Sequence, residues 1–488
     1  MSSIADSTRS ITGTRDAAPA AMTTSASACL LATVIGCGLG AACASRAASQ
    51  TSLPQQNEAA LPQEEHGHKS YVLPVIEIVA MDAGINRAGS FLLEPETFRV
   101  TGESIRRNLR GPWVVDDDPF QVNQFGHPYQ GAMYHGIARS NGLGYWPSAV
   151  YTFAGSALWE IAGETTKPSA NDQIASGIAG SFLGEPLFRI SRLLLDRADG
   201  RPGAWRILGS VLASPPTGIN HLLVGSPHGS PRSDAVPFSD IRVQFGVTAI
   251  PSDRSPSGYS LALDQPRLAL SMDHGYPGNA GYRHERAFDY FRIESSVSGD
   301  GLEHLSTRGL LAGTDYGAGR FGGIWGLYGT YDYFSPADFR FSSTAAAFGT
   351  TLQAPMAGPL VLQSSALAGA GYVASFSEDQ TDDFHYGVAP QGLVNLRVIA
   401  GSRAAVDLTA REYFVSGVGG FGTGQRDLIF VGDAWFAVRV FGKHGIALTY
   451  QRAGRSSDYL ELPDRTRAQS TVGVFYTFLG AGGFGAVR

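Results

Sequence analysis

The sequence predicts an α+β membrane protein, in which an N-terminal helical domain precedes an antiparallel transmembrane β-barrel of about 12 strands. Three observations predict this class. Charged residues make up 16 % of the 488-residue chain, against roughly 25 % in soluble domains. Glycine is abundant, at 61 residues. From about residue 238 onward, apolar residues alternate with polar or small ones, as a wall with one lipid-facing side requires.

The alternation is clearest in the run 242–248, where Val243, Phe245 and Val247 share one side. Twelve such runs are centred near residues 243, 270, 291, 308, 326, 346, 368, 392, 410, 435, 449 and 474. An even number of runs suits a closed barrel, whose first and last strands, 238–249 and 467–479, must pair. A soluble β-sandwich has the same period, but we expect few large apolar residues on the inner face here, which favours the barrel.

Segment boundaries follow from shifts in composition. We expect an export segment over residues 1–48, a flexible linker over 49–69, a helical domain over 70–230, a barrel over 236–480 and a tail over 481–488. Within the helical domain, helices are predicted over 130–140, 147–163 and 169–196. This domain is too large for the lumen of such a barrel, so it is expected to be periplasmic or barrel-associated.

Small residues recur every four positions at Ser176, Gly180 and Gly184, which places them on one helix face. A glycine inside a helix costs about 1 kcal/mol relative to alanine, and close approach of a neighbouring helix is the usual compensation. We therefore expect the segments 148–163 and 176–185 to pack tightly against each other.

The N-terminal region predicts export. It contains Cys29, Cys37 and Cys43, which are the only cysteines of the chain, and a compact apolar run over 28–39 that suits a signal peptide. Residues 34–37 also resemble a lipoprotein box, in which Cys37 would be acylated. The predicted location is the outer membrane of a Gram-negative bacterium, with outer-membrane lipid and the barrel assembly machinery as partners. The net charge of −6 argues against nucleic acid as a partner.

The segment 104–185 resembles a known family. The residues that carry the likeness are SIRRNL at 104–109, WVVD at 113–116, DPF at 118–120, VNQF at 122–125, HPYQG at 127–131, YTFAGSALWE at 151–160 and NDQIASG at 171–177. They are similar to the bacterial domain of unknown function 3943 family, whose members are uncharacterised envelope proteins. The likeness extends more loosely through 288–291, 331–333 and 408–413. It implies an envelope location and no particular activity.

The helical domain also holds the densest group of polar residues that could carry chemistry. The candidate catalytic residues are His127, His135, Glu160, Glu164 and Asp172, with Glu185 nearby in sequence. Histidines and carboxylates serve both general acid–base catalysis and zinc or iron binding. A network of hydrogen bonds that fixes the helix packing is the preferred interpretation, because the spacing is irregular. No cofactor is predicted, and the acidic run 116–118 is interpreted as a solvated turn.

The barrel sequence predicts a charged lumen. Arg292, Arg308, Arg397 and Arg411 fall on strand-like runs, where pairing with residues such as Asp407 or Glu412 would form ionic ladders. The preferred function is therefore structural, in envelope maintenance or in transport, and an enzymatic role is left open. One alternative is a membrane-embedded hydrolase of lipid or cell-wall substrates that uses the His/Glu/Asp group. The other is a soluble periplasmic β-sandwich binding protein.

Overall fold

The computed structural model describes residues 69–487, apart from 93–94, 117, 197–201, 226–237, 256–257, 280, 319–320, 336–339, 377–383, 418–425 and 459–463. The predicted export segment and almost all of the predicted linker lie outside the described residues.

The C-terminal half forms one closed antiparallel barrel of twelve strands. Its strands are β1 (Ser239–Ser255), β2 (Gly258–His274), β3 (Phe291–Ser298), β4 (Gly301–Ala318), β5 (Phe321–Phe334), β6 (Arg340–Pro355), β7 (Leu360–Phe376), β8 (Phe384–Ala400), β9 (Ala404–Gly417), β10 (Arg426–Phe441), β11 (His444–Asp458) and β12 (Arg465–Leu479). Each of the twelve predicted centres falls within one of them. Strands β1 and β12 close the sheet from Arg242 opposite Leu479 to Ala249 opposite Val472. The predicted fold is thus confirmed, and the two-sheet sandwich is wrong.

The two ends of the barrel differ. At one end, here called the turn end, lie the start of β1, the end of β12 and the tight turns at Gly401 and Gly442, whose φ angles are +57° and +51°. The opposite end, here called the loop end, carries the longer connections between β7 and β8, β9 and β10, and β11 and β12.

The outward face of the wall is apolar along much of its circumference, as the alternation predicted. Exposed outward side chains on β1, β5, β6 and β8–β12 include Phe245, Val247, Trp325, Phe348, Val394, Leu396, Val406, Leu408, Phe430, Phe436, Ile446, Leu448, Val474 and Tyr476. Such a surface suits contact with lipid.

The lumen is filled by large side chains, which corrects the expectation of a mostly small inner face. Tyr328, Phe341 and Tyr413 point inward and are almost fully buried. The tail after β12 folds back into the turn end, where Phe484 packs against Trp435. Aromatic residues occur on both faces of strands such as β5, and an alternation pattern does not tell which aromatic set points inward.

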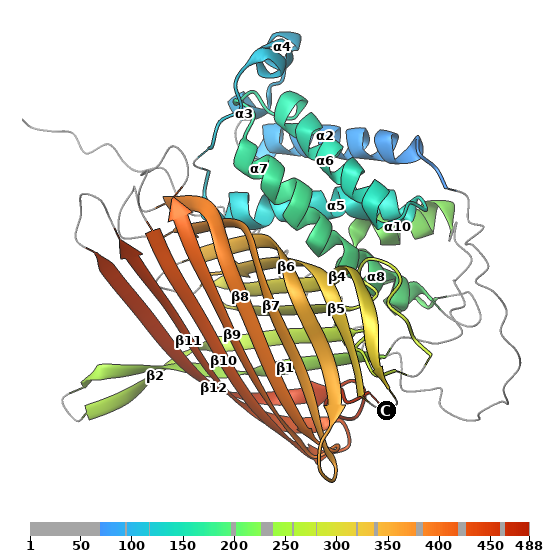
Figure 1. Ribbon diagram of the computed structural model, residues 1–488. Helices are drawn as coiled ribbons and strands as arrows, with labels where there is room; N and C mark the ends of the chain where they lie inside the picture. Colours follow the sequence, from blue (N-terminus) through green and yellow to red (C-terminus); the bar gives the residue numbers. More distant parts are fainter. Residues whose placement is uncertain are drawn as a thin grey trace, which may run out of the picture.

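The helical part lies against the outside of the barrel (Figure 1). Its elements are α2 (Leu73–Leu92), α3 (Pro95–Phe98), α4 (Gly102–Arg110), α5 (His127–Ser140), α6 (Tyr145–Ala162), α7 (Ala170–Ile174), α8 (Gly180–Leu195), α9 (Ala204–Ala213) and α10 (Pro215–Val224), with π-helical turns η1 (Val122–Gly126) and η2 (Ala175–Ala179). Among the described residues, no helix combines the length and apolar character needed to cross a membrane.

Contacts between the helices and the wall use outward-facing strand residues. The hydroxyl of Tyr331 on β5 donates to the carbonyl of Gln124 at 2.6 Å, and that of Thr307 on β4 donates to the carbonyl of Phe182 at 3.3 Å. Phe182, Leu183 and Leu187 of α8 belong to one apolar core with wall residues of β2–β5. The helical domain is therefore barrel-associated and outside the lumen, as expected, and its periplasmic position stays a prediction.

The stripe of small residues on α8 packs mainly against α5, not against α6 as predicted. A Cβ atom at Gly180 would lie 2.6 Å from the Cα atom of Gly131 on α5, and one at Gly184 would lie 2.8 Å from the Cβ atom of His135. Gly177 of η2 lies against α6, where a Cβ atom would lie 2.5 Å from the ring of Phe153. The reciprocal glycine at position 131 is the physical reason, because it lets the backbones of α5 and α8 approach closely.

Candidate functional site

The predicted polar residues separate into three groups in the structure. One group brings His127, Glu160 and Asp172 together, with ligand-type atoms that all lie within 4.8 Å of one another. All three side chains are buried. His135 joins a second group with Glu185, and Glu164 lies apart from both. The predicted catalytic role of these residues stays a prediction.

Local sequence explains how the first group assembles. Turn η1 ends at Gly126, and His127 begins α5 directly after it. Ser169 caps α7 by accepting a hydrogen bond from the backbone N–H of Asp172, which fixes Asp172 in the first turn. Glu160 lies in the last turn of α6 and accepts from the backbone N–H of Ser169 at 2.8 Å. Three helix ends therefore meet at this point.

Asp116 also belongs to the first group, which corrects its interpretation as part of a solvated turn. Its Oδ1 atom accepts hydrogen bonds from Asn123 at 2.7 Å and from Asn171 at 3.1 Å. Its carboxyl group also shares a hydrogen bond with that of Asp172. The run of three aspartates suggested exposure, and no sequence period linked position 116 to a helix that begins more than fifty residues later.

Burial dominates the electrostatics of this group. It lowers the pKa of His127 to about 4, so the imidazole is neutral at pH 7. Burial, together with the nearby carboxylates, raises the pKa of Glu160 to about 8 and holds the pKa of Asp172 well above its ordinary value. Burial also raises the pKa of Asp116, but hydrogen bonds from Asp172, Asn171 and Asn123 outweigh it and leave that pKa low.

The second group joins α5, α8 and the barrel through one carboxylate. Glu185 contacts His135 Nε2 at 3.0 Å, Arg139 Nε at 2.8 Å and Arg189 Nε at 2.9 Å. Arg189 continues to Asp289, beside β3, at 3.3 Å. Burial would raise the pKa of Glu185, but the two arginines and His135 hold it well below its usual range. This fully paired carboxylate links α5 and α8 to the barrel, and the interpretation of the polar residues as a structural network stays a prediction.

Glu164 has local partners. Its carboxylate accepts from Trp159 Nε1 at 2.8 Å and from the Thr166 hydroxyl at 3.0 Å. These bonds close the connection after α6. The spacing of Glu160 and Glu164 suggested a shared role, but α6 ends at Ala162 and the two side chains diverge.

The lumen contains the largest ionic network among the described residues. Arg397 contacts Asp407 at 2.7 Å and Asp273 at 3.1 Å, and Arg292 reaches the same two aspartates at 3.4 and 3.1 Å. Arg411 extends it to Glu294 at 3.3 Å. The predicted ionic ladder is present across β2, β3, β8 and β9. Glu412 is an exception, because it is exposed on the outward face.

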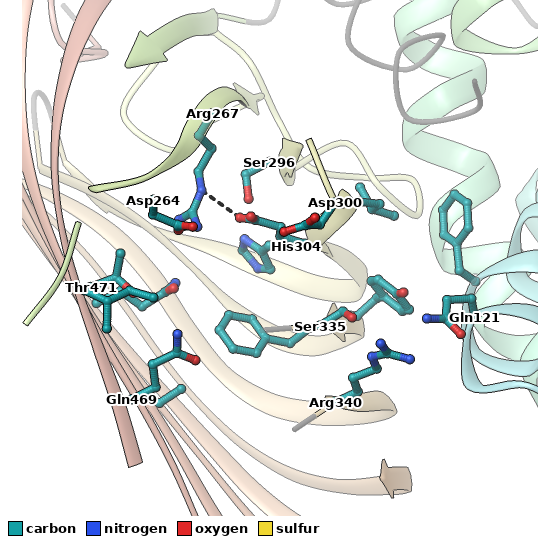
Figure 2. A pocket seen from close by; sticks show the side chains of 18 residues that line it. Gln121, Asp264, Arg267, Ser296, Asp300, His304, Ser335, Arg340, Gln469 and Thr471 are labelled. Carbon is teal, nitrogen blue, oxygen red and sulfur yellow. Dashed lines mark ion pairs between the residues drawn. The ribbon is translucent and has the colours of Figure 1, made fainter. Parts of the chain in front are cut away.

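A polar cavity of about 380 Å³ lies above this network, at the loop end. Its wall includes Arg267 and Asp264 of β2, His304 of β4 and Gln469 of β12, with Gln121 contributed by the helical part (Figure 2). Arg267 Nε contacts Glu303 at 2.6 Å. We call this cavity the vestibule. It was not predicted, because its residues come from strands far apart in sequence.

A serine–histidine pair was also missed from the sequence. Ser239 Oγ lies 2.8 Å from His274 Nδ1, because the register of β1 and β2 places the two residues opposite each other at the turn end. The sequence offered many serines and five barrel histidines, and only strand register selects this pair.

Residues 112–216 match the model of a family described as "Domain of unknown function (DUF3943)". This segment of the chain is therefore similar to the DUF3943 family. The resemblance found in the sequence is confirmed, and the matched segment contains His127, Glu160, Asp172 and Asp116. The looser likeness expected within the barrel lies outside the matched residues and stays a prediction.

Solved structures with similarity to the chain are outer-membrane barrels. OmpT of Vibrio cholerae is 8 % identical, with 51 % of this chain and 98 % of that chain covered and a TM-score of 0.20. The translocator domain of the autotransporter NalP from Neisseria meningitidis is 10 % identical, with coverages of 49 % and 88 % and a TM-score of 0.22. The anion-selective porin from Comamonas acidovorans is 9 % identical, with coverages of 50 % and 99 % and a TM-score of 0.17. No curated protein matches the chain.

Proposed function

We propose that this chain is an outer-membrane protein whose plugged barrel anchors the DUF3943 domain in the envelope, in a structural, envelope-maintenance role. The filled lumen is the observation that carries the proposal. The ionic network around Arg397 and Asp407 crosses the lumen, and the side chain of Arg397 is only 1 % exposed. The tail closes the turn end, where Gln363 Nε2 donates to the carbonyl of Gly485 at 2.8 Å and Gln353 hydrogen-bonds Val487.

Insertion in the membrane is supported by the outward belt of apolar side chains and by the closed hydrogen-bonding of the sheet. In lipid, every backbone polar group must be satisfied internally, and a closed barrel meets that requirement. A belt that is continuous over β8–β12 and β1 has no other partner among the described residues. The helical domain covers the wall on the opposite side.

Transport is the second candidate, and the vestibule is the observation that favours it. Its wall is polar and its volume is about 380 Å³, so it could hold a small solute before passage. Passage through the lumen would require the ion pairs of Arg397 and Arg292 with Asp407 to break. It would also require the tail to move out of the turn end.

One experiment tests membrane insertion and separates the two roles. The full chain is expressed in a Gram-negative host, fractionated, tested for heat-modifiable gel mobility and reconstituted in planar bilayers and solute-loaded liposomes. We expect an outer-membrane product that shifts on heating, with no steady conductance and no solute efflux. A detergent-free soluble product would refute insertion, and steady conductance or selective efflux would favour transport.

A further inference from the structure

We propose that His127, Glu160 and Asp172, with Asp116 beside them, bind one divalent transition-metal ion inside the helical domain. This site is independent of the membrane role proposed above. It rests on the geometry, charge and surroundings of the group.

The distances suit a shared ion better than direct hydrogen bonds. His127 Nε2 and Asp172 Oδ2 are 3.5 Å apart, longer than the 2.7–3.2 Å of N–H···O hydrogen bonds. Two ligands bound tetrahedrally at about 2.1 Å from a zinc ion lie about 3.4 Å from each other. Glu160 completes a set whose three ligand atoms all lie within 4.8 Å of one another. An ion at the centre of this set would lie at most about 2.8 Å (4.8 Å divided by √3) from each ligand atom, so each side chain would move by less than about 1 Å to reach the bonding distance of about 2.1 Å.

The group lacks the positive charge that buried carboxylates require. Asp116, Glu160 and Asp172 surround a single imidazole, and no lysine or arginine among the described residues forms an ion pair with them. The Glu185 group provides the contrast within the same domain, because two arginines pair with that one carboxylate. Burying carboxylates without a partner is costly, and a divalent cation is the partner this site lacks.

The surrounding hydrogen bonds match those of built metal sites, whose ligands are oriented by outer partners. The second ring nitrogen of His127, Nδ1, lies 3.5 Å from the hydroxyl of Ser176, which is a contact and not a hydrogen bond at that distance. The Glu160 carboxylate is held by the backbone N–H of Ser169, and Asp116 is held by Asn123 and Asn171. Both π-helical turns flank the group, since η1 precedes His127 and η2 contains Ser176. Such turns are frequent at functional sites.

The ligand types restrict the ion. Calcium and magnesium prefer oxygen ligands only, whereas one imidazole with carboxylates suits zinc, manganese or ferrous iron. The site is enclosed, and its ligands come from α5, the end of α6 and α7. A bound ion would therefore join three helix ends next to η1, which is hydrogen-bonded to the wall through Tyr331. We infer a structural ion that holds the helical domain in its docked form.

The test uses the full chain in detergent micelles, purified without chelator. Bound metal is measured by inductively coupled plasma mass spectrometry, and the thermal midpoint is measured after chelation and after addition of Zn²⁺, Mn²⁺ or Fe²⁺. The variants His127→Gln, Glu160→Gln and Asp172→Asn keep side-chain size. Glu164→Gln is the matched control, because it removes a neighbouring half-buried carboxylate that hydrogen-bonds Trp159 and Thr166 instead.

We expect about one equivalent of one of these metals in the wild-type chain and in Glu164→Gln. Chelation should lower the thermal midpoint, and re-addition should restore it. Each ligand variant should bind the metal more weakly by at least the roughly 10- to 100-fold that loss of a supporting partner costs. Sub-stoichiometric metal together with a midpoint that none of the three ions shifts would overturn the proposal and leave a proton shared by Asp116 and Asp172 as the explanation. Because the wild-type measurement needs no variant, misfolding of a variant does not decide the result.

Discussion

At the scale of single residues, Asp82 on α2 shows how a carboxyl group in the helical domain responds to burial. Its Oδ1 atom accepts a hydrogen bond from the Tyr134 hydroxyl of α5 at 2.5 Å. Burial raises the pKa of Asp82 to about 7, against the opposing effect of the Tyr134 hydrogen bond. The folded state therefore favours the protonated acid. Its contribution to stability is complete below the unfolded pKa of about 4 and is lost as the pH rises through about 7.

Asp82→Asn should remove this pH dependence, because an amide keeps the shape of the neutral acid. We expect the wild-type chain in micelles to lose stability between pH 5 and pH 8 relative to the variant. Only the two pH units between pH 5 and the folded pKa of about 7 contribute, so the difference has an upper limit of about 3 kcal/mol, at roughly 1.4 kcal/mol per unit. Denaturant titrations at both pH values measure it, with the exposed Glu103→Gln on α4 as control. Parallel pH profiles for wild type and Asp82→Asn would contradict the expectation.

The candidate site was only partly predictable at this scale. Residue type alone predicted His127, Glu160 and Asp172 as site residues from the sequence. It also nominated His135 and Glu164, which the structure places elsewhere. The separation has a physical cause, because His127 and His135 point to different sides of α5 and Glu164 lies beyond the end of α6. Asp116 was missed because its partners, Asn123 and Asn171, are amides whose role depends on the tertiary contact.

At the scale of elements, the contact between α5 and α8 depends on two glycines, Gly131 and Gly180, whose lack of a side chain lets the two backbones approach closely. A Cβ atom at Gly180 would lie 2.6 Å from the Cα atom and 2.8 Å from the carbonyl carbon of Gly131, so only backbone atoms could move aside. The stripe of small residues predicted a close contact, but not which helix makes it. A partner helix is identified by its own glycine. On α5 the regular spacing of small residues runs through Ala132, Gly136 and Ser140 and does not include Gly131.

Gly180→Ala should destabilise the helical domain by about 1–3 kcal/mol, because overpacking a tight contact forces backbone shifts. Gly84→Ala is the matched control. A Cβ atom at Gly84 on α2 meets nothing within 4 Å, so the better helix propensity of alanine should stabilise by up to about 1 kcal/mol. Thermal unfolding followed by circular dichroism compares the two variants. Equal midpoints for both would show that α5 and α8 are less closely packed in solution.

At the scale of the whole molecule, the sequence predicted the barrel more completely than the arrangement around it. The predicted period and number of strands were right, because each strand of a wall with one lipid-facing side alternates apolar and polar residues along its own sequence. The filling of the lumen was not predictable in this way. The inward aromatic rings, the returning tail at Phe484 and the vestibule all join strands that are distant in sequence. The position of the helical domain depends on wall residues such as Tyr331, which alternation alone would assign to lipid.

The outer wall of the barrel has one side covered by the helical domain and one side with exposed apolar residues. Phe436 of β10 and Ile293 of β3 both point outward, but Phe436 is 43 % exposed and Ile293 is 0 % exposed beneath the helical domain. An apolar, carbene-generating reagent dissolved in the bilayer should therefore modify Phe436 and spare Ile293, as mapped by mass spectrometry of the reconstituted full chain. The inward residue Tyr328 serves as a control for reagent entering the lumen. Modification of Ile293 to the same extent as Phe436 would mean that the helices leave the wall in lipid. Absence of modification at both residues would argue against membrane insertion, because the belt on β8–β12 would then face no lipid.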